Sequence, residues 1–162
     1  MSLVAGLTGA LLLGVISVLV VFVGGMRAGW PPVVDTVRRI NRSRLNPEQL
    51  KTAGSPGAFA GVLRHSGRVS GKRYETPLGV VLTEDGFVIA LVYGQRTEWL
   101  KNVLAAGSAF IIHEGVTYEV DRPEVVPIDD EAERFTTSDR LSQWILGIDT
   151  CLRVHRVGVA AD

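Results

Sequence analysis

Residues 65–78 read HSGRVSGKRYETPL and connect two apolar segments through a turn rich in glycine and serine. Two apolar segments joined in this way predict a β-hairpin. The turn gathers Arg68, Lys72 and Arg73, and tight glycine turns leave backbone N–H groups free to face an anion. Composition alone is compatible with two kinds of ligand at this tip: a small molecule with several negative charges, or the headgroups of lipids.

The chain on both sides of this hairpin has the pattern of a small β domain. A continuous apolar run at 87–93 suits a buried strand, and helical spacing recurs at 97–106 and 129–141, with Thr97 as the N-cap of the first helix. The other expected strands cover 58–65, 73–83, 109–113, 116–120 and 150–157. Six strands without βαβ alternation predict a mainly β (α+β) domain, a mostly antiparallel barrel with peripheral helices.

A second stretch with chemical character covers residues 93–102, YGQRTEWLKN. A buried strand ends there in a glycine turn, and a helix begins at once. The first amides and the dipole of a helix favour phosphate, and Arg96 would reinforce that preference. Asn102 lies one turn after Trp99 and could donate to the same ligand, whereas the spacing of Trp99 itself favours the core.

Together, the two stretches resemble a known family. Gly-Arg-x-Ser-Gly-(x4)-Thr-Pro-Leu at 67–78, followed by Trp-x-x-Asn at 99–102, is similar to the deazaflavin-dependent nitroreductase family, whose members are actinobacterial oxidoreductases. The resemblance covers about residues 46–126. It implies a split β-barrel, like that of FMN-binding proteins, which binds coenzyme F-420, a deazaflavin with a phosphate and an oligoglutamate tail. The carboxylates of that tail suit the basic turn.

The resemblance also implies a set of binding residues. The turn and its basic neighbours would hold the tail and the phosphate, and Thr76 and Pro77 would lie beside the ring. The expected cofactor-binding residues are Arg64, Gly67, Arg68, Ser70, Gly71, Lys72, Arg73, Thr76, Pro77, Gly94, Arg96, Trp99 and Asn102.

The implied reaction is hydride transfer between the deazaflavin and an apolar, membrane-soluble acceptor such as a quinone or an unsaturated lipid. Tyr93 is the candidate proton donor. Two alternatives stay open: an oxidoreductase that uses FMN, and a non-catalytic carrier of a lipid or fatty acid on the same barrel.

The N-terminal segment differs from the rest, because no charged side chain occurs between Ser2 and Met26. A helix needs about 20 apolar residues to cross a hydrocarbon core, so we expect one transmembrane helix within residues 1–26. A cleaved signal peptide is the main alternative, but no Lys or Arg precedes this long apolar run. Arginines follow the span, which predicts a single-pass protein of the cell membrane with its C-terminal domain in the cytoplasm.

Residues 27–45 form an expected basic amphipathic segment between the anchor and the barrel, which is assigned to 46–162. Apolar residues recur at helical spacing from Val33 to Ile40, with arginines between them, so the segment would lie on anionic lipid. Charge is distributed unevenly: residues 27–73 carry ten Lys or Arg and two Asp or Glu, and residues 74–162 carry seven and fifteen.

The remaining reactive side chains are few. Cys151 is the single cysteine and suits a reducing compartment, and three scattered histidines give no metal-ligand spacing, so no metal is expected. The expected partners are the lipid bilayer and an apolar small-molecule substrate, with no nucleic acid. Split barrels are often dimers, so a homodimer is a further expectation.

Overall fold

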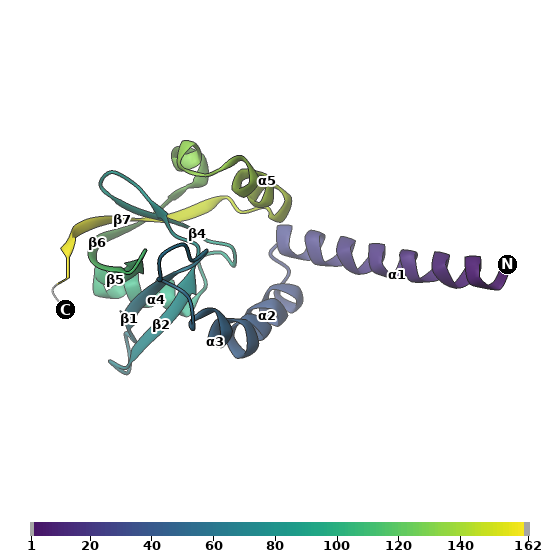
Figure 1. The fold of residues 1–162 in the computed structure, drawn as a ribbon, viewed down its shortest axis with the longest axis horizontal. Helices are drawn as coiled ribbons and strands as arrows, with labels where there is room; N and C mark the ends of the chain where they lie inside the picture. Colours follow the sequence, from purple (N-terminus) through teal and green to yellow (C-terminus); the bar gives the residue numbers. More distant parts are fainter. Residues whose placement is uncertain (1, 161–162) are drawn as a thin grey trace.

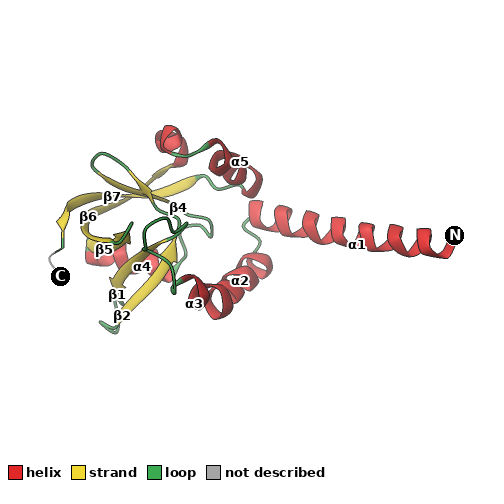
Figure 2. Cartoon of the chain, in the orientation of Figure 1, coloured by secondary structure: helices red, strands yellow, loops and turns green. Residues whose placement is uncertain are grey.

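The computed structural model describes residues 2–160 and contains a curled antiparallel sheet flanked by helices (Figure 1, Figure 2). Met1 of the expected anchor and residues 161–162 of the expected barrel lie outside this range. The strands are β1 (Gly61–Ser66), β2 (Arg73–Leu78), β3 (Val81–Leu82), β4 (Gly86–Ala90), β5 (Ser108–His113), β6 (Val116–Pro127) and β7 (Thr150–Val159). They pair in the order β2-β1-β5-β6-β7-β4-β3.

The two edge strands of this sheet are neighbours along the chain. β2 ends at Leu78 and β3 begins at Val81, so residues 79–80 alone connect opposite edges of the sheet. Three residue steps span at most about 11 Å, which requires the sheet to curl until its edges approach each other. The expectation of a mostly antiparallel, barrel-like domain is therefore confirmed as a half-barrel, with seven strands instead of six.

The inside of the half-barrel is the hydrophobic core. Its fully buried side chains include Leu63, Phe87, Ile89, Leu100, Ile111 and Leu152. Helix α4 (Glu98–Ala106) packs against β1, β5 and β6. On the other face of β4, Val88 packs with Cys151 near the 3₁₀ helix η2 (Ile128–Arg134). Both faces of β4 are covered, which explains its continuous apolar sequence.

Two expected strands are shorter than the sequence indicated. The strand expected at 73–83 is interrupted after Leu78, where the chain crosses from one edge of the sheet to the other. The strand expected at 87–93 ends at Ala90, and the chain then turns toward Gly94, which has a positive φ of 66°. The loop made by this early ending places Tyr93 outside the sheet.

The expected helix at 129–141 is two helices, η2 and α5 (Thr137–Leu146). The break follows from a capping box that the sequence analysis missed. The Asp139 carboxylate accepts the Thr136 N–H at 3.1 Å, and the Thr136 hydroxyl accepts the Asp139 N–H at 3.2 Å. Phe135, which is buried with Val88 and Cys151, is extended and separates the two helices.

The N-terminal part is helical and consists of α1 (Ser2–Arg27), α2 (Pro31–Ile40), a π-helical turn η1 (Asn41–Leu45) and α3 (Asn46–Gln49). Figure 1 shows α1 extending away from the half-barrel. Within the described residues no single helix is both long and apolar enough to cross a membrane. The pair Leu11–Arg27 and Pro31–Gln49 meets these conditions only together, with a bend of 100° between its members. The single transmembrane helix expected within residues 1–26 is thus not found in this part of the chain.

The close approach of β4 to β7 gives a stability prediction. A Cβ added at Gly86 would lie 1.9 Å from the Val154 carbonyl oxygen, which belongs to the backbone and cannot rotate away. We expect Gly86→Ala to lower the free energy of unfolding by about 1–3 kcal/mol, as overpacking in a core does. The control is Gly158→Ala in β7, where an added Cβ meets no atom within 4 Å. Thermal unfolding of the two purified variants in detergent tests this, and equal melting temperatures would contradict the close contact.

Candidate functional site

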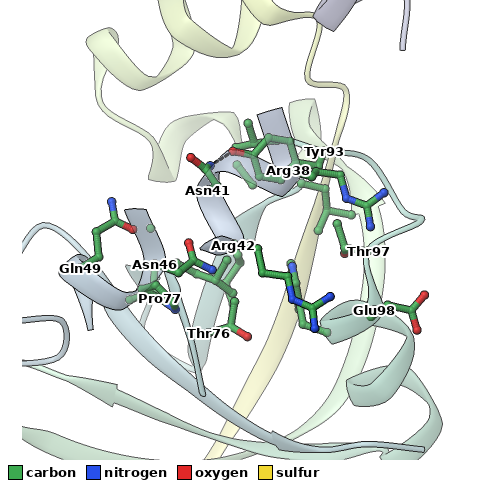
Figure 3. Close-up of a pocket in the computed structure, with 18 of the residues that line it drawn as sticks. Arg38, Asn41, Arg42, Asn46, Gln49, Thr76, Pro77, Tyr93, Thr97 and Glu98 are labelled. Atoms are coloured by element: carbon green, nitrogen blue, oxygen red, sulfur yellow. Dashed lines mark hydrogen bonds between the residues drawn. The ribbon is translucent and has the colours of Figure 1, made fainter. Parts of the chain in front are cut away.

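A large cavity in the described part of the chain has a volume of about 1350 Å³. It lies between the α2–η1–α3 segment and β2, and the β4–α4 loop and α5 complete its wall (Figure 3). Ligand pockets typically measure roughly 300–1,000 Å³. The cavity therefore has room for a cofactor together with a second molecule.

The expected cofactor-binding residues and the expected proton donor Tyr93 fall into two groups relative to the cavity. Those that line it are Gly67, Arg68, Ser70, Thr76, Pro77, Tyr93, Gly94, Trp99 and Asn102. Those that do not line it are Arg64, Gly71, Lys72, Arg73 and Arg96. Arg64 instead pairs with Glu75 on the neighbouring strand at 2.7 Å, and the Lys72 ammonium lies 5.9 Å from the centre of the Tyr74 ring. The most exposed cations of the hairpin tip thus face away from the cavity.

Asn102 connects the β1–β2 turn to α4. Its side chain is buried, and its Oδ1 accepts the backbone N–H of Arg68 at 3.1 Å and the Arg68 guanidinium at 3.0 Å. The same guanidinium donates to Glu98 at 2.8 Å. Hydrogen bonds from Lys101 and Arg68 lower the pKa of the Glu98 carboxyl to about 2, so Glu98 is ionised and balances Arg68.

His65 continues this network and was not among the expected site residues. With Oδ1 of Asn102 occupied as an acceptor, the amide Nδ2 donates to His65 Nδ1 at 3.3 Å. The imidazole proton then lies on Nε2, which is 3.3 Å from the Thr76 hydroxyl. Burial lowers the pKa of His65, because the charged imidazolium is poorly solvated there. A neutral histidine therefore fixes the position of Thr76 at the cavity wall.

The N-terminus of α4 contains an unsatisfied polar group. The hydroxyl of Thr97 is buried and has no hydrogen-bond partner, the one such side-chain atom found in the described residues. Thr97 precedes α4 as expected, but its side chain does not cap the helix. It lines the cavity beside backbone N–H groups that helix geometry leaves without intrahelical partners. An anion in the cavity could accept hydrogen bonds from both.

Tyr93 faces the helical segment across the cavity. The Asn41 amide donates to its hydroxyl oxygen, a contact drawn as a dashed line in Figure 3. Burial raises the pKa of Tyr93, so the phenol stays protonated near neutral pH. Because its oxygen accepts from Asn41, its own O–H remains available to donate.

From the sequence, the basic side chains of α2 and η1 are expected to contact anionic lipid. In the structure, Arg38, Arg39 and Arg42 line the cavity. Arg38 and Arg42 are four residues apart, and this spacing was the available signal that they share one face of a helix. Periodicity could not indicate that this face meets a cavity of the half-barrel.

No family model matches the chain, and a search of curated proteins finds no relative. Among solved structures, an F-420 reductase covers 68% of this chain and 94% of its own, with 13% identity and a TM-score of 0.45. An FMN-binding protein from Syntrophomonas wolfei covers 79% and 95%, with 14% identity and a TM-score of 0.40. The haem storage protein HutZ from Vibrio cholerae covers 73% and 94%, with 14% identity and a TM-score of 0.45. The names of these three proteins refer to F-420, to FMN and to haem. Each name describes the protein that bears it.

The unpartnered Thr97 hydroxyl predicts that its removal affects stability and ligand affinity in different directions. Thr97→Val keeps the side-chain shape and removes a buried group without a partner, so we expect the ligand-free protein to keep its stability or gain up to about 1 kcal/mol. The affinity for a phosphate-bearing ligand should fall. Thr83→Val is the control, because the Thr83 hydroxyl accepts the Gly86 N–H at 3.0 Å and its loss should destabilise by about 1 kcal/mol. Equal destabilisation by both variants would mean that Thr97 has a partner.

The environment of His65 predicts a pH dependence. Its folded pKa lies below the ordinary value of 6.5, so the unfolded chain takes up a proton first as the pH falls. Stability is then complete above about pH 6.5 and declines below it, by at most about 1.4 kcal/mol per pH unit from this group. Melting temperatures between pH 5 and 8 test this. His65→Gln should flatten the decline, whereas His113→Gln should keep it; an unchanged slope in His65→Gln would contradict the assignment.

Proposed function

We propose that the protein is an oxidoreductase that binds coenzyme F-420 in the cavity between α2–η1–α3 and β2. The observation that carries this proposal is the buried, unpartnered Thr97 hydroxyl at the N-terminus of α4. A phosphate is the group that such a site accommodates. The two sequence motifs that resemble the deazaflavin-dependent family, at 67–78 and 99–102, meet in the same cavity through Asn102.

The residues present fit a cofactor of this kind. Thr97 and the first amides of α4 would hold its phosphate, and Arg68 at the β1–β2 turn adds positive charge nearby. Thr76 and Pro77 on β2 would lie against the ring. Gly94, with a positive φ of 66° and no atom within 4 Å of an added Cβ, leaves the loop open to a ligand. When bound, the deazaflavin supplies hydride transfer.

Tyr93 is the residue of the chain suited to proton transfer in this reaction. Its phenol is held protonated by its raised pKa, and the Asn41 amide fixes its oxygen at the cavity wall. A proton donor must lie within hydrogen-bond reach of the atom that it protonates. Tyr93 would therefore serve an acceptor that occupies the part of the cavity beneath η1.

We further propose that the acceptor is apolar and that the chain is held at a membrane. This is supported by the exposed side chains of α1, such as Leu11 at 72% and Val18 at 68%, which form an apolar surface that water solvates poorly. At the end of α1, Arg27 stacks on Trp144 of α5 at 5.5 Å, and Trp144 is 69% exposed. Sedimentation of the full chain with membranes, and its release when residues 2–26 are deleted, tests this. A full chain that stays in the supernatant would contradict the proposal.

Titration of the full chain in detergent with F-420 and with FMN, followed by fluorescence, tests the cofactor. We expect micromolar binding of F-420 and a weaker response to FMN, which lacks the acidic tail. Arg68→Ala should weaken F-420 binding by about tenfold or more, since it removes a charged hydrogen-bond donor at the cavity. Lys72→Ala is the control from the same turn, because Lys72 lies against Tyr74 outside the cavity.

The other outcomes identify the alternatives. Tighter binding of FMN than of F-420 would make the protein a flavin enzyme. A folded chain that binds neither compound would overturn the oxidoreductase proposal and favour a lipid or fatty-acid carrier on the same half-barrel.

A further inference from the structure

We propose that the α2–η1 segment carries an anion-binding site of its own: Arg38 and Arg42 bind a carboxylate or phosphate group of the molecule that fills the cavity. Both side chains extend from the helical segment into the cavity, toward Thr97 and Glu98 (Figure 3). The segment precedes the two sequence motifs. It therefore adds binding residues to the cavity from a different part of the chain.

The segment is fixed against the half-barrel at more than one point. The Asn41 amide donates to the Tyr93 hydroxyl, and α3 contacts β2. A valine at the start of α2, Val33, packs against Gly25 at the end of α1, where an added Cβ would lie 2.6 Å from its side chain. The wall that carries the arginines is thus a docked element whose position relative to the cavity is defined.

A π-helical turn lies within the segment that carries these side chains. The Asn46 N–H donates to the Asn41 carbonyl, five residues earlier, instead of four. Pro47 has no N–H, and its ring crowds the carbonyl four residues before it, so a wider turn accommodates it. Arg38, Asn41 and Arg42, which share one face by helical spacing, and Asn46 at the end of the turn all line the cavity.

Of the two arginines, Arg38 has a carboxylate partner, and Arg42 is exposed and has none among the described residues. Among the carboxylates that line the cavity, Glu98 is bound by Arg68 and Lys101 at 2.8 and 2.9 Å, Glu75 by Arg64 at 2.7 Å, and Asp139 accepts the Thr136 N–H at 3.1 Å. Asp35 pairs with Arg38 at 3.3 Å. Within residues 2–160 the Arg42 guanidinium has no ion pair or hydrogen bond.

Arg38 and Arg42 are one helical turn apart and share the single nearby carboxylate of their segment, Asp35, which pairs with Arg38, so the two guanidinium groups repel each other at the cavity wall. An oxyanion relieves this repulsion, and the planar fork of arginine matches carboxylate and phosphate oxygens in a bidentate geometry. The recognised chemistry is therefore an oxyanion attached to a larger ligand.

Two sources supply that oxyanion. One is the acidic tail of the cofactor, and in this form the inference rests on the proposed function. The other is the phosphate of an anionic lipid, which would reach the cavity from the side where α1 joins α2 and would make an anionic amphiphile the second ligand. The two sources differ in what else the ligand carries, so a binding experiment separates them.

The experiment compares Arg38→Gln plus Arg42→Gln with the wild-type full chain in detergent. The control is Arg44→Gln plus Lys51→Gln, which removes two charges from η1 and from the turn after α3, at residues that do not line the cavity. Melting temperatures establish that both variants fold. The probes are F-420, the deazaflavin core without phosphate and tail, short-chain phosphatidylglycerol, and phosphatidylcholine with the same acyl chains.

A fall of about tenfold or more in F-420 affinity, with the affinity for the core unchanged, would support the inference and assign the arginines to the cofactor tail. A similar fall for phosphatidylglycerol alone would support it and assign them to a lipid. If Arg38→Gln plus Arg42→Gln binds every probe as tightly as the control variant does, the inference is overturned. Binding of F-420 by the wild type would still leave the proposed function intact. If the wild type binds no F-420 or FMN, the proposed function fails and the phosphatidylglycerol comparison still decides the inference.

Discussion

One buried amide, the side chain of Asn102, holds the site together. Its oxygen accepts two hydrogen bonds from Arg68, and its nitrogen donates to His65, which in turn orients Thr76. These contacts tie the β1–β2 turn, α4 and β2 into one wall of the cavity. Removing the amide would leave the part-buried Arg68 donors without an acceptor and His65 Nδ1 without a donor, at a cost of about 1–3 kcal/mol for a buried group. Through these hydrogen bonds, Asn102 of the second sequence motif contacts Arg68 of the first.

Several charged side chains around Asn102 form ion pairs, and the polar groups without partners mark the places where a ligand can bind. Glu98 balances Arg68, and Glu75 balances Arg64. The Thr97 hydroxyl and the Arg42 guanidinium have no such partners among the described residues, and both line the same cavity. The buried Thr97 hydroxyl is a donor without an acceptor, which costs free energy that a bound anion would recover, whereas Arg42 is exposed. The ligand-free protein is therefore prepared for a molecule with anionic groups, in a cavity lined by both polar and apolar side chains.

The sequence was informative where local rules dominate. Alternation and turn residues located the strands approximately, and Thr97 correctly marks the start of α4. The breaks after Leu78 and at Phe135 were missed, because one depends on how the sheet edges meet and the other on a reciprocal capping box. Among site residues, the motifs indicated Asn102 and Thr76, which line the cavity, and also Lys72 and Arg73, which do not. The arginines of α2 and η1 could not be assigned, because the contact between Asn41 and Tyr93 joins residues far apart in the chain.

The most direct measurement is an experimental structure of the full chain with F-420 bound. The account predicts that the phosphate lies within hydrogen-bond distance of the Thr97 hydroxyl and the first amides of α4, with the ring against Thr76 and Pro77. Density for the cofactor on the outer face of the β1–β2 turn, beside Lys72 and Arg73, with the cavity empty, would contradict it.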